Sequence, residues 1–309
     1  MLLTATSQKS TIVRKNTAPL AIKAAFSVGS WIAPQKTIAR AVELFCKPSG
    51  EARRRATKAD DAGAGSFVLR SGPHELHVYQ WGDPSTEPYV LIAHGWSDFA
   101  LRFVPLVQAL RQQGYAVVTF DQPGHGRSSG DTATLPEFAR CIAAVGAHFS
   151  RAAAVVGHSM GGAAATIALH EGLAADRAVL VAPPADLAAA VDRFAGFVGL
   201  ATCLYDPLHR ALEERAAVRF VDLEAHRSVA EIDRPALIVH DIGDREVPWE
   251  EGERYARYWP ASRMLTTTGL GHNRILGDAG VIDAAIRFLR GETVGDRVVS
   301  SPNLPFGFA

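Results

Sequence analysis

The sequence has few cysteines and no long apolar run. Its three cysteines, Cys46, Cys141 and Cys203, are an odd number and lack the spacing of metal ligands. They fit a reducing, cytosolic-like compartment and give no disulfide framework. No apolar run approaches the roughly 18 residues that a membrane-spanning helix needs. We therefore expect a cytoplasmic protein, with peripheral attachment to a membrane as the alternative.

Several ligand-binding motifs are also missing. Because no G-x-G-x-x-G follows the first strand and no Walker-type G-K-[ST] is present, we expect no nucleotide cofactor. H-E-x-x-H and H-x-H-x-D-H are absent, and His240, Asp241 and Asp244 within one loop make a weak case for a metal. The basic cluster at residues 53–55 has no interleaved aromatic residues, so we expect a solvated linker and no nucleic-acid partner.

The formal net charge is zero, but the charge is unevenly distributed. Residues 1–58 hold eleven Lys and Arg residues and two acids, an excess of nine positive charges that the remainder balances. This asymmetry in charge indicates that the N-terminal region is a separate structural unit. With 309 residues, 48% hydrophobic and 21% charged, the chain can bury one large core or two modest ones.

The N-terminal region is predicted to be helical and basic. Residues 1–17 are polar and without acids, as in a transit peptide or a disordered tail. Beyond them, helical spacing gives an apolar stripe that Pro34 interrupts. The stripe consists of Ala21, Ala25, Val28, Ile32, Ile38, Ala41, Val42 and Phe45. We expect residues 1–60 to be an amphipathic extension whose stripe packs on the main domain or its lid; the alternative is contact with an anionic membrane surface.

Short apolar strands alternate with helical segments from residue 66 onward. Strands are expected at 67–70, 77–81, 89–93, 116–120, 152–156, 177–181, 236–240 and 263–267. This alternation predicts an α/β fold with a mostly parallel central sheet and helices on both faces. No strand is expected within 183–233, where apolar helical segments predict a small lid inserted after the sixth strand. The expected units are a core of 61–182 and 234–291, this lid, the extension, and a C-terminal tail at 292–309.

The stretch Gly157-His158-Ser159-Met160-Gly161 lies between an apolar strand and an Ala-rich helix. Glycine on both sides of the serine removes Cβ atoms that would collide in so sharp a turn. We expect Ser159 to adopt a strained conformation that presents its Oγ to a substrate, with helix N–H groups aimed at the same point. The alternative is a tight glycine turn with a bystander serine.

Reactive side chains follow three strands. In an open α/β sheet the ligand site lies beyond the carboxyl ends of the strands, so Ser159, Asp244 and His272 are expected to converge. Four motifs fall at strand ends: an HG-x loop at 94–96, a D-x-x-G-x-G-x-S loop at 121–128, the serine turn, and a late G-x-G-H. Together they resemble the α/β-hydrolase fold family over about residues 66–290, including its Ser…Asp…His order.

The resemblance implies roles for these residues. Ser159 is the expected nucleophile, His272 its base, and Asp244 the carboxylate that orients the base, with Asp241, Glu246 and Asp186 as rivals for that last role. Family geometry places the oxyanion-hole donors at the backbone N–H groups of Trp96 and Met160. His94 and His158 are expected to support loops. Asp121, His125 and Arg127 are expected to brace the loop after their strand.

We therefore expect a serine hydrolase that cleaves a small-molecule carboxylic ester through an acyl-enzyme. The apolar lid favours a hydrophobic acyl or alcohol part. Acyl transfer, thioester or C–C hydrolysis, or cofactor-free perhydrolysis would use the same triad, and a non-catalytic binding protein on this fold is a further alternative. Dehalogenases of the family carry Asp at the position of Ser159, which disfavours their chemistry.

Overall fold

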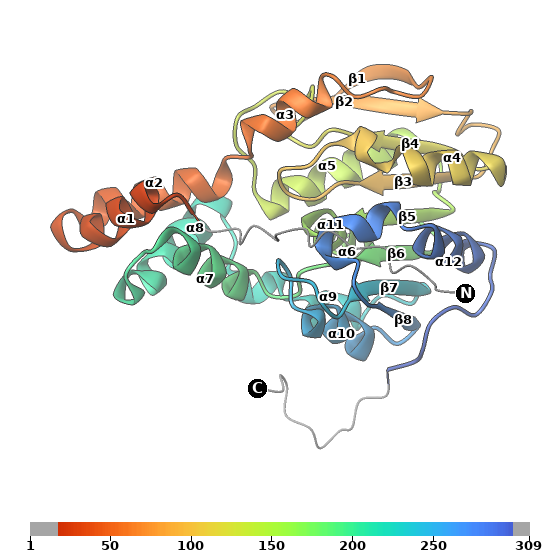
Figure 1. The fold of residues 1–309 in the computed structure, drawn as a ribbon. Coiled ribbons are helices and arrows are strands. Elements are labelled where there is room, and N and C mark those ends of the chain that lie inside the picture. The colour runs from red at the N-terminus through yellow and green to blue at the C-terminus, as the bar shows by residue number, and fades with distance from the viewer. Residues whose placement is uncertain (1–17, 299–309) are drawn as a thin grey trace, which may run out of the picture.

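The computed structural model describes residues 18–298 as an eight-stranded sheet surrounded by helices (Figure 1). The strands are β1 (Gly65–Ser71), β2 (His74–Trp81), β3 (Tyr89–Ala93), β4 (Ala116–Phe120), β5 (Ala154–His158), β6 (Ala178–Val181), β7 (Ala236–Asp241) and β8 (Ser262–Thr267). The α-helices are α1 (Leu20–Ile32), α2 (Pro34–Cys46), α3 (Gly50–Ala56), α4 (Val104–Gln112), α5 (Leu135–His148), α6 (Met160–His170), α7 (Leu187–Val198), α8 (Tyr205–Ala216), α9 (Ala225–Val229), α10 (Trp249–Tyr258), α11 (Gly271–Arg274) and α12 (Ala279–Leu289). The 3-10 turns are η1 (Ala100–Phe103), η2 (Thr202–Leu204), η3 (Phe220–Leu223) and η4 (Ile275–Gly277). The expected transit peptide or tail at 1–17, and positions 299–309 of the expected C-terminal tail, lie outside the described residues.

The sheet has the order β1-β2-β4-β3-β5-β6-β7-β8 and is mostly parallel, as predicted. Strand β2 runs antiparallel to its neighbours β1 and β4, and the other neighbouring strands pair in parallel. All residues of β3 are buried, as expected of a wholly apolar strand between two neighbours. The strand expected at 152–156 lies two residues later, and Ala152 forms only an isolated bridge to Ala175.

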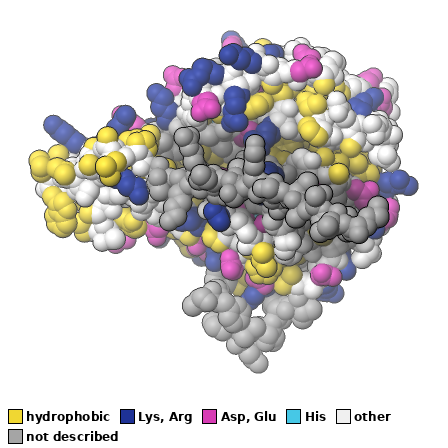
Figure 2. Space-filling model, viewed as in Figure 1, with side chains coloured by type: hydrophobic (Ala, Val, Ile, Leu, Met, Phe, Trp, Pro, Cys, Tyr) yellow, Lys and Arg dark blue, Asp and Glu magenta, His cyan; other side chains and the backbone are white. Residues whose placement is uncertain are grey.

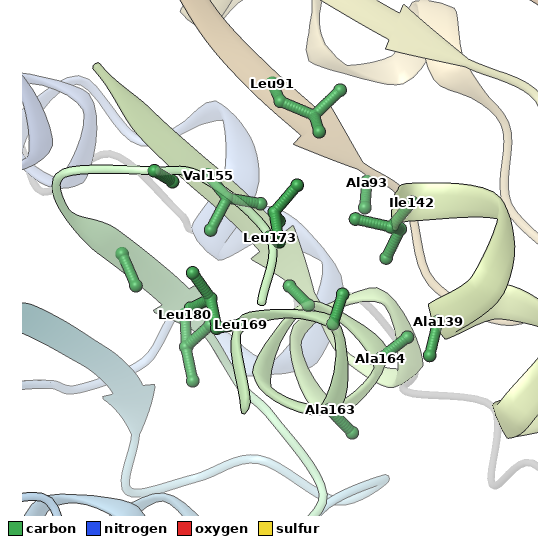
Figure 3. Packing of buried hydrophobic residues seen from close by; sticks show 14 of the residues in the cluster. Leu91, Ala93, Ala139, Ile142, Val155, Ala163, Ala164, Leu169, Leu173 and Leu180 are labelled. Atoms are coloured by element: carbon green, nitrogen blue, oxygen red, sulfur yellow. The ribbon is translucent and has the colours of Figure 1, made fainter. Parts of the chain in front are cut away.

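Helices cover both faces of the sheet. One face packs against α5, α6, α9 and α10, and the other against α4 and α12. Figure 3 shows Leu91, Val155 and Leu180, from three adjacent strands, on the side of the sheet where α6 lies. In the same view Ala164 of α6 lies on the side toward Ala139 of α5. Glycines at the start of α6 and the end of β5 leave no room for a Cβ between the two elements, so α6 packs close behind β5 and the turn that joins them is fixed in position.

Residues 183–233, here called the inserted helices, lie between β6 and β7 and form α7, η2, α8, η3 and α9. Their apolar side chains meet those of α1 and α2, so the four helices α1, α2, α7 and α8 gather beside the sheet (Figure 1). The members of this cluster include Phe26, Ala41, Val191, Val198, Leu208 and Leu212. The N-terminal extension and the inserted helices therefore share one apolar core.

The predicted packing of the N-terminal stripe is right for α2 and wrong for α1. Ile38, Ala41, Val42 and Phe45 of α2 join the shared cluster. The four α1 members of the stripe, at positions 21, 25, 28 and 32, are exposed. Helix α1 instead buries Phe26 and Ser30, whose hydroxyl accepts a hydrogen bond from Ala201 N at 3.1 Å. No helix within residues 18–298 combines the length and apolarity needed to cross a bilayer.

The basic cluster at 53–55 is not the solvated linker that was expected. It lies in α3, and Arg53 donates hydrogen bonds to the carbonyl oxygens of Gly126 at 3.1 Å, Ser128 at 2.5 Å and Gly130 at 3.1 Å. The other two arginines are exposed. A guanidinium offers five N–H donors, so one side chain satisfies several carbonyls of the 121–130 loop and anchors the extension to the core.

Candidate active site

Ser159 lies at the sharp turn between β5 and α6. Its backbone has φ 50° and ψ −128°, a conformation that non-glycine residues rarely adopt. A Cβ at Gly157 would lie 2.5 Å from Gly162 Cα, and one at Gly161 would collide with the carbonyl oxygen of His94. The strained turn expected from the glycine spacing is therefore present, and both glycines are required by close backbone contacts.

The HG-x loop passes directly over Ser159. A Cβ at Gly95 would come within 2.9 Å of Ser159 Cβ, so only glycine allows the loop this close. The next residue, Trp96, and the first residue of α6, Met160, both line the same cavity as Ser159. The N–H of Met160 opens its helix and has no intrahelical acceptor.

Asp244 and His272 are paired although 28 residues separate them. His272 Nδ1 lies 2.7 Å from Asp244 Oδ2, and the Asp244 side chain is fully buried. The other oxygen of Asp244 accepts the N–H groups of Glu246 at 2.8 Å and Val247 at 3.0 Å. These bonds fix the carboxylate, which in turn fixes the orientation of the imidazole.

Burial alone would raise the pKa of Asp244, but its hydrogen bonds outweigh burial. His240, whose Nε2 lies 3.5 Å away, and His272 both favour the charged carboxylate, as does the Val247 N–H. They hold the pKa of Asp244 well below its usual range. The group is therefore an anion at neutral pH, able to stabilise a positive charge on His272.

His158 holds the backbone of His272. Its Nε2 lies 3.0 Å from the His272 carbonyl oxygen, which can only accept, so the ring proton is on Nε2. Burial, with His272 next to it, keeps the pKa of His158 well below its ordinary value. The ring is neutral, and His158 has the supporting role that the sequence predicted.

His94 and His125 brace the loop that carries Trp96. His94 Nε2 accepts the N–H of Gln122 at 3.0 Å, and His125 Nε2 accepts the N–H of Ser97 at 3.0 Å. Burial, with His94 nearby, lowers the pKa of His125 to about 3, so this ring stays neutral. Both histidines therefore support the loop, as expected.

Asp121 also braces its own loop. It accepts hydrogen bonds from the N–H groups of Ala100 at 2.9 Å and Arg127 at 2.8 Å, and from Tyr79 Oη at 3.2 Å. This is the bracing role predicted for Asp121.

The rival acids are engaged elsewhere. Asp241 accepts the N–H groups of Leu270 and Gly243, each at 2.9 Å, and so supports the loop leading to His272. Glu246 binds the side-chain amide of Asn273 at 2.7 Å. Asp186 caps α7 through the N–H of Ala189. Of the four carboxylates considered, Asp244 is the one bonded to the His272 ring.

A mainly apolar cavity of about 400 Å³ lies over the turn. Ser159, Met160, Trp96 and His272 line it. Within residues 18–298 no hydrogen bond joins Ser159 Oγ to His272, and hydrogen bonds between a nucleophile and its base commonly tighten only when substrate binds. No group of three or more His, Cys, Asp or Glu in the described part of the chain is arranged to hold a metal.

The cavity has walls that the sequence did not single out. Helix α2 contributes Leu44, Phe45 and Cys46, and Phe45 packs edge-on against Phe194 of α7 with ring centroids 5.1 Å apart. The signal for Phe45 was its place in the apolar stripe, which was expected to pack on the main domain or its lid but gave no sign of a cavity. The extension thus forms part of the candidate site.

Arg193 is the one arginine or lysine in the cavity lining, among the residues described. It pairs with Glu251 at 2.6 Å, and Glu251 is nearly buried and also accepts the N–H of Ala185 at 2.8 Å. An arginine next to Asp192 in a mainly apolar helix gave no sequence signal for this position. The pairing places a fixed, partly neutralised charge at the wall.

The chain was compared with known proteins. Residues 84–257 match the model of a family described as serine aminopeptidase, S33. A comparison with curated proteins gave no match.

Three of the similar solved structures illustrate the likeness in fold. The esterase RhEst1 from Rhodococcus sp. ECU1013 is 19% identical, with a TM-score of 0.55, over 74% of this chain and 98% of that one. The 2-hydroxy-6-oxo-6-phenylhexa-2,4-dienoate hydrolase from Rhodococcus sp. strain RHA1 is 16% identical, with a TM-score of 0.56, over 74% and 99%. Alpha/beta hydrolase domain-containing protein 10 from mouse is 16% identical, with a TM-score of 0.58, over 74% and 98%. These matches confirm the fold that the four motifs indicated.

Proposed function

Because the chain belongs to the serine aminopeptidase S33 family of α/β-hydrolases, we propose that it is a serine hydrolase that cleaves carboxylic esters with a hydrophobic acyl or alcohol part. The observation that carries the proposal is the buried 2.7 Å pair of Asp244 and His272, with His272 and the strained Ser159 lining one mainly apolar cavity.

The reaction begins with attack of Ser159 Oγ on the ester carbonyl carbon. His272 Nε2 takes the hydroxyl proton during attack and returns it to the leaving alcohol oxygen as the C–O bond breaks. Asp244 keeps the other ring proton on Nδ1 and stabilises the imidazolium. Water then attacks the acyl-enzyme with His272 again as base, which releases the acid and regenerates Ser159.

The negative oxygen of each tetrahedral intermediate needs N–H donors that are already in place. We assign these to the backbones of Trp96 and Met160, which flank Ser159 in the cavity. Gly95 and the bracing of His94 and His125 support this assignment, because they keep the Trp96 loop close to the serine. One such donor contributes roughly 3–4 kcal/mol.

The cavity lining favours an ester over an N-terminal peptide bond. An aminopeptidase must hold the α-ammonium of its substrate, which carboxylates do. Among the described lining residues Glu246 is the only carboxylate, and it is bonded to Asn273, while Arg193 adds positive charge. The remaining lining suits an apolar group. We therefore assign an ester with an apolar part as the substrate class.

A fluorophosphonate probe followed by peptide mapping tests the nucleophile. We expect labelling at Ser159 and turnover of p-nitrophenyl esters that improves with chain length. Ser159→Ala should lose at least about 10⁴-fold in kcat, while Ser85→Ala, at an exposed serine, should match the wild type. Normal turnover by Ser159→Ala would refute the assignment.

Assays of the same protein preparation distinguish ester hydrolysis from the other reactions that this triad could catalyse. Aminoacyl p-nitroanilides, acyl thioesters, vinylogous diketones, and alcohol or peroxide acceptors are assayed beside the esters. We expect the apolar esters to give the highest kcat/KM. A higher value for any other substrate, with Ser159 still labelled, would keep the nucleophile and overturn the substrate class.

A further inference from the structure

The outward face of α1 is apolar along its whole length. Its exposed side chains include Leu20 (84% exposed), Val28 (56%), Trp31 (76%) and Ile32 (77%). The remaining exposed positions of the helix are alanines and one serine. Such a continuous face is unusual on a protein surface, where large apolar residues are normally scattered singly.

Positive charge surrounds this face. Helix α1 contains no acidic residue, and the α1–α2 hairpin carries Lys23, Lys36 and Arg40, with Lys47 after it. Its one acid, Glu43, pairs with Arg40 at 2.9 Å. Figure 2 shows hydrophobic and basic side chains together on the part of the surface that these two helices form.

The hairpin extends from the sheet and also reaches the candidate active site. The junction of α1 and α2 forms the outer end of the molecule in Figure 1. The opposite end of α2 contributes Leu44 and Phe45 to the cavity. From Pro34 to Phe45 the helix rises only about 17 Å, so a surface that holds the junction also lies near one wall of the cavity.

We propose that the outward face of α1 docks on an anionic lipid bilayer. Its apolar side chains enter the headgroup region, with Trp31 at the depth where indole rings are enriched, while Lys36 and Arg40 bind acidic headgroups. A bilayer fits better than a protein partner because the face has positive charge at its edges and needs no matching shape. Docking would give the enzyme access to lipophilic esters, and this role rests on the proposed function. The docking itself does not depend on that function.

Vesicle sedimentation with the full chain tests the proposal. The probes are vesicles of phosphatidylcholine alone and of phosphatidylcholine mixed with phosphatidylglycerol, at low and high salt. We expect stronger binding to the anionic vesicles, reduced by salt. The double variant Trp31→Lys with Ile32→Lys should bind at least about tenfold more weakly. Val68→Lys, at a 59% exposed apolar residue on β1, is the matched control and should bind like the wild type.

Further measurements separate docking from unfolding, self-association and catalysis. Because Trp31 and Ile32 are exposed and outside the cavity lining, the double variant should keep the wild-type melting temperature and its turnover of soluble esters. Ser159→Ala should bind vesicles normally, so loss of the proposed function and loss of docking are distinguishable. Wild-type binding by the double variant would overturn the proposal. The proposal would also be overturned if the wild type were a dimer that does not bind vesicles and the double variant were a monomer. A second copy of the chain would then cover the face.

Discussion

Replacing Asp244 by asparagine would change an acceptor into a donor at the point where His272 is held. Asp244 Oδ1 accepts two backbone N–H groups, and Oδ2 faces His272 Nδ1 at 2.7 Å. In Asp244→Asn the amide oxygen must stay with the two N–H groups, so the NH₂ group faces the ring. His272 Nδ1 then has to accept, which moves the ring proton to Nε2.

A proton on Nε2 leaves His272 unable to accept from Ser159. Substitutions of this kind in serine enzymes lower kcat by about 10⁴, which corresponds to about 5.4 kcal/mol of lost transition-state stabilisation. We expect a loss of that order in Asp244→Asn at neutral pH, measured as kcat with p-nitrophenyl butyrate. KM should change little, because the side chain does not line the cavity.

Asp241→Asn is the matched comparison. Its carboxylate also accepts backbone N–H groups, but from Leu270 and Gly243, and it does not contact the imidazole. We expect a smaller loss of kcat than in Asp244→Asn, and circular dichroism would establish that both variants are folded. A loss below tenfold for Asp244→Asn, or a larger loss for Asp241→Asn, would refute the assigned roles.

Three other outcomes follow from the contacts described. Phe45→Ala should lower kcat/KM for long-chain esters by about tenfold and leave kcat/KM for short esters unchanged. Phe197→Ala, at a residue outside the cavity, is the control. Equal losses of kcat/KM in the two variants would contradict the role of α2. Arg53→Ala should lower the free energy of unfolding by about 1–3 kcal/mol in urea titrations, because three carbonyls lose a charged donor; no change would mean that α3 is held by other contacts. The lowered pKa of Asp244 stabilises the fold above about pH 4, the ordinary carboxyl value, and this contribution is lost as pH falls toward the folded-state pKa. The difference in melting temperature between wild type and Asp244→Asn should therefore shrink below about pH 4, and a constant difference would contradict the shift.

The sheet and its reactive edge were predictable from the sequence. A strand buried on both faces is mainly apolar, and Tyr89–Ala93 was located to the residue for that reason. Ala116–Phe120, with Thr119 as its polar residue, was also located to the residue. Chemistry-bearing residues directly after such strands have to meet at one edge of the sheet. This rule predicted that Asp244 and His272 lie together, as they do in the structure.

The packing of the N-terminal helices was only partly predictable. The expectation that the stripe packs on the main domain or its lid is right for α2 and wrong for α1, because helical spacing shows that a stripe exists but not which residues it contacts. Phe45 therefore gave no sign that it lines the cavity, and Val28 gave no sign that it is exposed. Arg53 was misjudged for a related reason, since a run of arginines is usually solvated and only the fold brings three carbonyls within its reach.

Because α2 forms one wall of the cavity, the substrate range of a homologue depends on its N-terminal helices as well as on its sheet. The family match begins at residue 84, so it excludes Leu44 and Phe45. Two chains with the same sheet and the same serine turn, but different opening segments, would select different molecules. The opening segment is therefore a place to alter selectivity while Ser159, Asp244 and His272 stay unchanged, provided that the apolar core it shares with α7 and α8 is kept.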